Sequence, residues 1–171
     1  SVIHAFKDEQ NVNNMGGVWR KLPYTYALMI IGTLALTGFP FLSGFYSKDA
    51  IIEFAYLKGN TTGYYAAGIG IFTAFLTSVY SWRLIFKTFH GTYNNKIVKI
   101  EETHESPLVM LIPLVILSIG SIFAGFLFKD LFVGHGGENL FWAESIKFLE
   151  PLSTEHPPTW FLILTPILVT I

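Results

Sequence analysis

The feature that most limits the fold of this chain is a nearly uncharged run of 36 residues, Leu22–Leu57. Its only formal charges are Lys48, Asp49 and Glu53, and the string G-F-P-F-L-S-G (Gly38–Gly44) interrupts it. A charged side chain at bilayer depth costs about 2.5–3.5 kcal/mol on insertion scales, and ionisable groups kept there usually mark ion or proton paths. The run therefore indicates a membrane protein that takes part in moving protons or ions.

Composition supports this class of protein. Charged residues make up 13% of the chain, compared with about 25% in soluble domains, and the net charge of −1 provides no basic surface for nucleic acid. Because the chain has no cysteine, disulfides and thiolate-held iron–sulfur clusters are excluded, and we expect neither a cofactor nor a metal in it. The chain begins with Ser1, and its last apolar run, Pro158–Ile171, is shorter than the roughly 20 residues of a spanning helix, so we expect a fragment cut at both ends.

The uncharged run is too long for one straight crossing of a membrane. At 1.5 Å per residue, the segment 23–58 would reach about 50 Å, whereas the hydrocarbon core measures about 30 Å. Two full crossings would leave arms of only about 15 residues. We predict one crossing by a broken helix with a linker near 38–42, because Pro40 removes a backbone hydrogen bond and Gly38 permits unusual dihedral angles. Transporters place ion sites at such breaks.

The whole sequence predicts an all-α fold, a polytopic transmembrane helix bundle that includes this discontinuous membrane helix. Further transmembrane helices are expected over 63–90 and 106–128, and a truncated one begins over 158–171. The other expected segments are the end of a preceding transmembrane helix over 1–6, polar loops over 7–22 and 91–105, and a long loop with an interfacial helix over 129–157.

The distribution of basic residues tests the number of crossings. One crossing by the broken helix divides the loop lysines and arginines seven against three, and two crossings divide them six against four. The seven are Lys7, Arg20, Lys21, Arg83, Lys87, Lys96 and Lys99, and the three are Lys58, Lys129 and Lys147. The positive-inside rule favours one crossing, which places the loops 7–22 and 91–105 in the cytoplasm or matrix.

Three charged residues of the broken helix are candidates for proton transfer. Desolvation disfavours the ammonium form of Lys48 while a nearby anion stabilises it, so a neighbouring charge that moves can change its protonation. Asp49 points about 100° around the helix from Lys48 and pairs with it or with a residue elsewhere. Glu53 shares the face of Asp49, and these two carboxylates form a relay or end the helix near water. The alternative for all three is a solvated segment at the membrane interface.

Other polar residues have two interpretations each. His4 precedes a polar loop and is a candidate because imidazole exchanges protons near neutral pH, although a packing or interfacial histidine explains it equally well. Thr73, Thr77 and Ser81 line one helix face, where helix packing is favoured over a water chain. The sequence contains no phosphate loop, nucleophile–base pair or dinucleotide fingerprint, and no histidine pair spaced for a metal or haem within a span.

Three strings indicate a family. They are S-V-I-H-A (residues 1–5), D-E-Q-N-V-N-N-M-G-G (8–17) and L-A-L-T-G-F-P-F-L-S-G-F-Y-S-K-D (34–49). With these strings the chain resembles a fragment from the C-terminal half of the antiporter-like chain 5 family of NADH–quinone oxidoreductase, respiratory complex I. The resemblance is clear to about residue 128 and weaker beyond. Multisubunit sodium/proton antiporters are the nearest rival family, but they usually carry a different acidic residue after the lysine.

The resemblance implies a fold of two inverted five-helix repeats, each with one broken helix. Tyr24–Leu57 would be the broken helix of the second repeat. Lys48 would belong to the family's central chain of protonatable residues, Asp49 would lie beside it on the exit side, and His4 would lie near that chain. The first repeat, the second lysine of the second repeat, the long lateral helix and the final anchor would all lie outside this fragment, so this piece alone should not pump.

The implied function is that of a segment of a proton-translocating membrane subunit. NADH-to-quinone electron transfer would occur elsewhere in the complex, with no redox chemistry in this chain. The alternatives are a subunit of a multisubunit sodium/proton antiporter or membrane-bound hydrogenase and, from another class, a structural membrane scaffold. We expect other membrane subunits of complex I, the lipid bilayer and protons as partners, and a location in the mitochondrial inner membrane or the bacterial plasma membrane.

Overall fold

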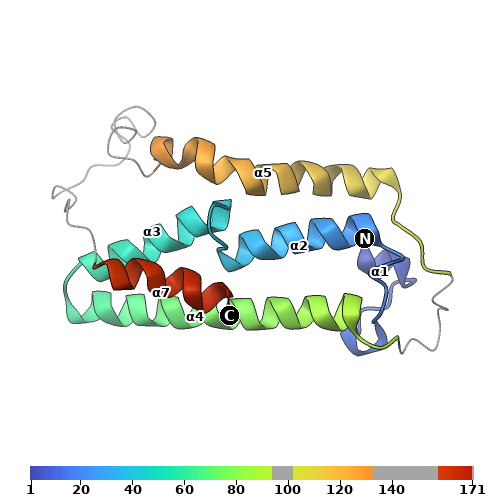
Figure 1. The fold of residues 1–171 in the computed structure, drawn as a ribbon, viewed down its shortest axis with the longest axis horizontal. Coiled ribbons are helices and arrows are strands. Elements are labelled where there is room, and N and C mark those ends of the chain that lie inside the picture. Colours follow the sequence, from blue (N-terminus) through green and yellow to red (C-terminus); the bar gives the residue numbers. More distant parts are fainter. Residues whose placement is uncertain (94–101, 133–157, 171) are drawn as a thin grey trace. The chain divides into compact units, whose positions relative to one another are not determined.

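A computed structural model describes residues 1–93, 102–132 and 158–170, and all the regular structure in these ranges is helical (Figure 1). The α-helices are α1 (Val2–Ala5), α2 (Pro23–Thr37), α3 (Ser43–Leu57), α4 (Thr61–Ile85), α5 (Leu108–Phe132) and α7 (Thr159–Thr170). A short 3-10 helix, η1 (Val12–Asn14), and a π-helical turn, η2 (Phe86–His90), complete the set. The predicted all-α class with a discontinuous helix is confirmed. The expected interfacial helix falls almost wholly in 133–157, outside the described residues.

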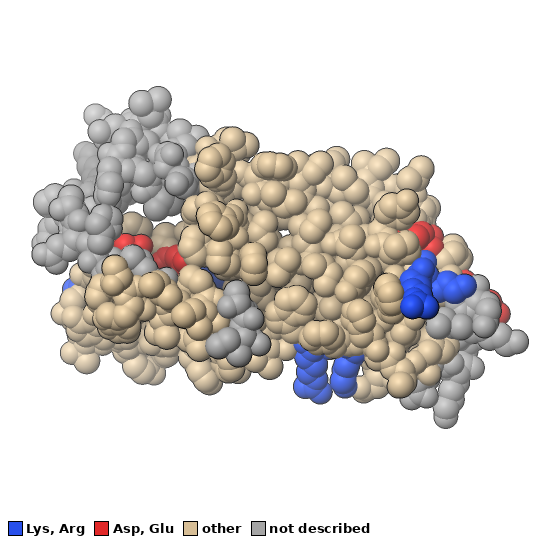
Figure 2. Space-filling model, viewed as in Figure 1, with Lys and Arg blue, Asp and Glu red and all other residues tan. Residues whose placement is uncertain are grey.

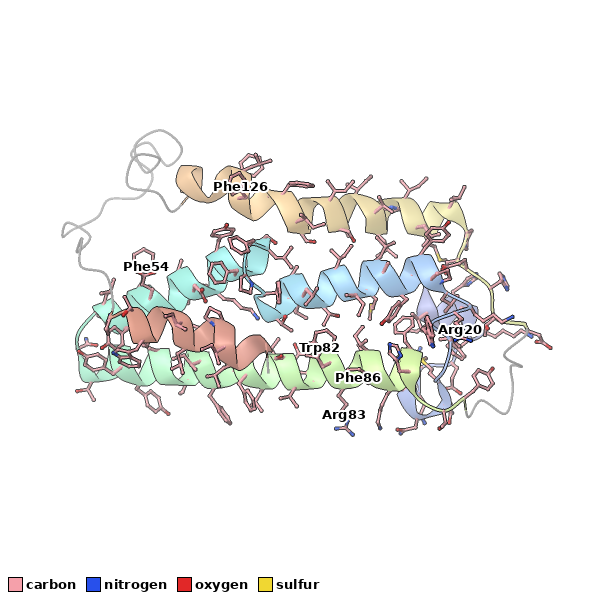
Figure 3. The ribbon with its side chains drawn as sticks, viewed as in Figure 1. Arg20, Phe54, Trp82, Arg83, Phe86 and Phe126 are labelled. Atoms are coloured by element: carbon pink, nitrogen blue, oxygen red, sulfur yellow. The ribbon has the colours of Figure 1, made fainter. Side chains whose placement is uncertain are left out.

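Among the described residues, two helices are long and apolar enough to cross a membrane, namely Thr61–His90, which joins α4 to η2, and the part of α5 over Leu108–Phe128. The helices α2 and α3 have 15 residues each, about 22 Å at 1.5 Å per residue, which is short of a 30 Å hydrocarbon core. Wide areas of the surface carry neither acidic nor basic side chains (Figure 2). On α4, Arg83 points outward, as a snorkelling cation does (Figure 3).

The first of two compact units joins Ser1–Leu34 to Val79–Gly120. Its apolar core brings Phe6 and Leu22 from the N-terminal segment together with Ile85 and Phe89 from the end of α4 and from η2. All four side chains are almost completely buried. The apolar residues that flank the polar loop therefore anchor that loop to the end of the long helix.

The polar loop between α1 and α2 has its own internal support. The backbone N–H of Asn11 donates to Glu9 Oε1 at 2.8 Å, and the Asn14 side chain donates to Glu9 Oε2 at 3.0 Å. These donors, the Asn11 N–H first, hold the pKa of Glu9 below its usual value. Gly16 has φ +152°, and a Cβ there would overlap the carbonyl oxygen of Thr92, so the loop packs backbone to backbone at this point.

The N-terminus of α2 is capped by a residue about 80 positions away. The backbone N–H groups of Tyr24 and Thr25 donate to Glu105 Oε1 at 2.8 and 3.3 Å, and the Thr25 hydroxyl donates to Glu105 Oε2 at 2.8 Å. The first N–H groups of a helix have no partner within the helix, and a carboxylate there also complements the helix dipole. Glu105 therefore supplies a cap that the local sequence around Pro23 lacks.

The second compact unit joins Ala35–Ser78 to 121–171. Its buried core consists of Ile52, Ala67 and Phe161, and the Tyr56 ring lies 4.3 Å from the Phe161 ring between centroids. In this unit α5 approaches the start of α3 at a glycine. A Cβ on Gly125 would lie 2.5 Å from Ser43 Cα, so the helix contact requires the absence of a side chain.

We expect Glu105→Ala to lower the free energy of unfolding by about 1–2 kcal/mol, because two backbone donors of α2 lose their acceptor and the dipole loses its counter-charge. Chemical unfolding of the chain in detergent, followed by circular dichroism, measures this. Glu102→Ala is the matched control, since it removes the exposed 2.8 Å ion pair with Lys7 and should cost less than about 1 kcal/mol. Equal losses for the two variants would contradict the cap.

We expect Gly125→Ala to destabilise the fold by about 1–3 kcal/mol, because the added methyl group meets the backbone at Ser43. Gly120→Ala is the control on the same helix. A Cβ there meets nothing within 4 Å, so this variant should gain up to about 1 kcal/mol from helix propensity. Thermal unfolding in detergent compares the two, and a Gly125→Ala variant as stable as the parent would refute the close contact.

Candidate functional site

The candidate site lies at the break between α2 and α3, within the second compact unit. The chain leaves α2 at Thr37 and enters α3 at Ser43. Gly38 has φ +90°, a backbone angle that side-chain-bearing residues rarely adopt, and Phe41 has φ +71° despite its side chain. Pro40 lacks the N–H that a continuous helix would need. Three linker residues are therefore incompatible with a continuous helix, two through positive φ and one through its missing N–H.

The two half-helices approach each other closely across the break. A Cβ on Gly44, in the first turn of α3, would overlap the carbonyl oxygen of Ala35 in the last turn of α2. A Cβ on Gly38 would lie 3.6 Å from Lys48 Cδ, so the lysine stem runs past the linker at van der Waals distance. The glycines at both ends of the string G-F-P-F-L-S-G thus face backbone or the lysine stem instead of open space.

Lys48 is half-buried, and its ammonium group turns back across the break. The Nζ atom donates a hydrogen bond to the backbone carbonyl oxygen of Leu36, in the last turn of α2. The last carbonyls of a helix have no intrahelical partner, and they carry the negative end of the helix dipole. The C-terminal end of α2 is therefore the negative pole that receives the cation.

Asp49 and Glu53 lie on the same helix as Lys48, but they take no part in the hydrogen bond to Leu36. Both side chains are half-buried, and they are close enough for their negative charges to oppose each other. No ion pair joins Lys48 to either carboxylate in the part of the chain that the structure describes. Of the two pairings that the sequence left open for Asp49, the one with Lys48 is thus not formed. The site separates a cation held by backbone from two adjacent carboxylates.

The remaining sequence candidates lie on α1 and α4. His4 is on α1 in the first compact unit, and its imidazole is exposed. The Thr77 hydroxyl donates to the Thr73 carbonyl at 2.8 Å, as the packing interpretation expects, while the buried Ser81 hydroxyl has no partner among the described residues. Within the described ranges no group of three histidine, aspartate or glutamate side chains is positioned to hold a metal.

Sequence reasoning missed one aromatic cluster in the first compact unit. The Tyr26 hydroxyl lies 2.8 Å from His90 Nε2, and the Trp19 ring stacks on the imidazole with centroids 6.0 Å apart. Arg20 places its guanidinium carbon 4.8 Å from the centre of the Trp19 ring. The π-helical turn that carries His90 has no sequence signature, although the aromatic residues around it are visible in the sequence.

Comparison with known proteins gives the site a context. Residues 1–77 match the NADH:quinone oxidoreductase/Mrp antiporter transmembrane family. The chain is 49% identical over 87% of its length to NADH-ubiquinone oxidoreductase chain 5 of Marchantia polymorpha, 46% over 98% to that of Phytophthora infestans, and 53% over 80% to that of Dictyostelium citrinum. It spans only 20–26% of the length of these relatives.

These matches indicate a class of protein first: the chain is similar to part of antiporter-like membrane proteins, and its helix break carries an ionisable side chain. Within that class, residues 1–77 match the NADH:quinone oxidoreductase/Mrp antiporter family, and most of the chain is similar to a segment of chain 5 of NADH-ubiquinone oxidoreductase. The resemblance read from the three strings is therefore confirmed, as is the assignment to a membrane helix bundle.

We expect Gly44→Ala to destabilise the second compact unit by at least about 1–3 kcal/mol, because the added methyl group overlaps the Ala35 carbonyl and the first turn of α3 must move. Gly68→Ala, at an exposed position on α4 where a Cβ meets nothing within 4 Å, is the control and should be neutral or stabilising. Thermal unfolding by circular dichroism in detergent measures both. Indistinguishable melting curves for the two variants would contradict the close approach of the half-helices.

Proposed function

We propose that this chain is a segment of the proton-translocating, antiporter-like membrane subunit of NADH:ubiquinone oxidoreductase. The observation that carries the proposal is the combination of 46–49% identity to chain 5 proteins over most of the chain with an ionisable lysine at the break of a membrane helix. Electron transfer from NADH to quinone takes place in other subunits. No redox chemistry and no cofactor are assigned to this chain.

In this proposal Lys48 is the proton carrier. A lysine can carry a proton only if its surroundings stabilise the ammonium differently in two states of the protein. Backbone carbonyls supply a fixed partial charge, whereas a neighbouring anion or water supplies a variable one. Asp49 and Glu53 are the adjacent groups that accept or return the proton, and His4 is a further candidate nearer the polar loop. The energy of electron transfer reaches Lys48 as changes in charge and hydration.

The proposed partners follow from the same family. They are the other membrane subunits of the complex, the lipid bilayer and the translocated protons, and nucleic acid is not among them. The relatives named above come from eukaryotes, which favours the mitochondrial inner membrane over a bacterial plasma membrane. The loops 7–22 and 91–105 would face the matrix, as the excess of basic residues on that side suggests.

Two other functions remain distinguishable by experiment. The family description includes Mrp antiporters, so a sodium/proton antiporter or a membrane-bound hydrogenase subunit is a rival, but the relatives at 44–53% identity are chain 5 proteins. Transport that needs sodium and proceeds without an NADH dehydrogenase would select the rival. A structural scaffold would retain full function when Lys48 and Asp49 are both replaced by apolar residues.

We expect Lys48→Met, introduced into the full-length subunit of the intact complex, to abolish most of the proton pumping that this subunit contributes. The reason is that methionine preserves the length and apolar contacts of the stem but cannot bind a proton. Protons translocated per NADH oxidised, measured in sealed vesicles or proteoliposomes, report the loss. Lys58→Met is the matched control, because Lys58 is an exposed lysine at the end of the same helix and should leave pumping unchanged. An unaltered stoichiometry in Lys48→Met would refute the assignment.

A further inference from the structure

The carbonyl that binds Lys48 is made available by a proline. In a continuous α-helix the carbonyl oxygen of Leu36 would accept the N–H of residue 40. Residue 40 is proline, which has no N–H, so helix formation through the linker cannot satisfy this oxygen. An orphan backbone carbonyl in an apolar, water-poor environment is strongly unfavourable. The sequence therefore creates an acceptor at Leu36 that needs a donor from elsewhere.

Lys48 is the donor that pairs with this carbonyl oxygen. Its Nζ atom hydrogen-bonds to the Leu36 oxygen, while its stem passes Gly38 with Cδ 3.6 Å from where a Cβ would lie. The close approach of Gly44 to the Ala35 carbonyl brings the start of α3 against the end of α2, within reach of a lysine side chain. No carboxylate shares the ammonium among the described residues, so the bond to Leu36 is the recorded polar contact of Nζ.

We propose that Pro40 is a positioning residue for proton transfer by Lys48: by removing the N–H of residue 40 it reserves the Leu36 carbonyl for the lysine amine. The inference rests on the proposed function and names the group that holds the proton carrier. The counter-charge of Lys48 is then the C-terminal end of the half-helix α2 and not the adjacent Asp49. Such a partner does not itself titrate, and the Asp49 carboxylate is not committed to an ion pair with Lys48.

The pairing links protonation to the strength of the contact across the break. When Nζ gives up one proton to a neighbouring base or water, it becomes a neutral amine that still has N–H groups for the Leu36 oxygen. A charge-assisted hydrogen bond is roughly twice as strong as a neutral one, so the contact weakens on deprotonation and strengthens on protonation. The two half-helices are consequently held more firmly when the proton is present.

The test is Pro40→Ala in the full-length subunit of the intact complex, examined by electron cryo-microscopy and by proton pumping. Alanine restores an N–H at residue 40, which competes for the Leu36 oxygen as α2 extends past Gly38. We expect density in which the Lys48 amine has left that oxygen, and pumping reduced towards the level of Lys48→Met. Pro113→Ala is the matched control, because it makes the same substitution inside α5, far in sequence from the break, and should retain wild-type density at Lys48 and wild-type pumping.

The outcomes separate this inference from the proposed function. If Pro40→Ala pumps normally with Lys48 still bound to Leu36, while Lys48→Met is inactive, the positioning role of Pro40 is wrong and the proposed function stands. If Lys48→Met itself pumps normally, the proposed function fails. Should Pro40→Ala not assemble, the native complex decides. Density with Nζ on the Leu36 oxygen supports the pairing, and density with Nζ on the Asp49 carboxylate overturns it.

Discussion

Two groups that an apolar environment penalises satisfy each other at the centre of this chain. A helix-end carbonyl without a donor and an ammonium ion without a counter-charge each cost several kcal/mol away from water. The hydrogen bond from Lys48 to Leu36 removes the first penalty and reduces the second. The conformation of the linker and the close packing at Gly44 bring these two groups together.

Local rules were sufficient to predict the break. Pro40 forbids one hydrogen bond of a continuous helix and Gly38 accepts a φ of +90°, so the interruption between Thr37 and Ser43 follows from residues within the interrupted segment. The all-α membrane class could equally be predicted from the sequence, because it depends on hydropathy and charge content. The family could be predicted because two of its three strings, residues 8–17 and 34–49, include the polar loop and the linker, where specific residues are needed for backbone contacts.

Contacts between residues distant in sequence could not be predicted in this way. Nothing around Pro23 indicates that Glu105 accepts two backbone N–H groups of α2, since the two segments are about 80 residues apart. The acceptor for Lys48 was missed because every residue has a backbone carbonyl, so residue types do not reveal which one accepts. The neighbouring carboxylates are the acceptors that residue types suggest. Its one sequence signal is the spacing from Leu36 to Pro40. The roles of Lys48, Asp49, Glu53 and His4 in proton transfer stay predictions.

The left-handed backbone of the linker also determines how the break can change. Gly38 and Phe41 have φ of +90° and +71°, whereas helical residues have φ near −60°. To straighten the chain, both residues must leave the left-handed region, and for Phe41 the Cβ makes the intervening φ values sterically unfavourable. Intermediate degrees of bending are therefore not available by small adjustments. The linker geometry therefore favours distinct conformations of the break over gradual bending.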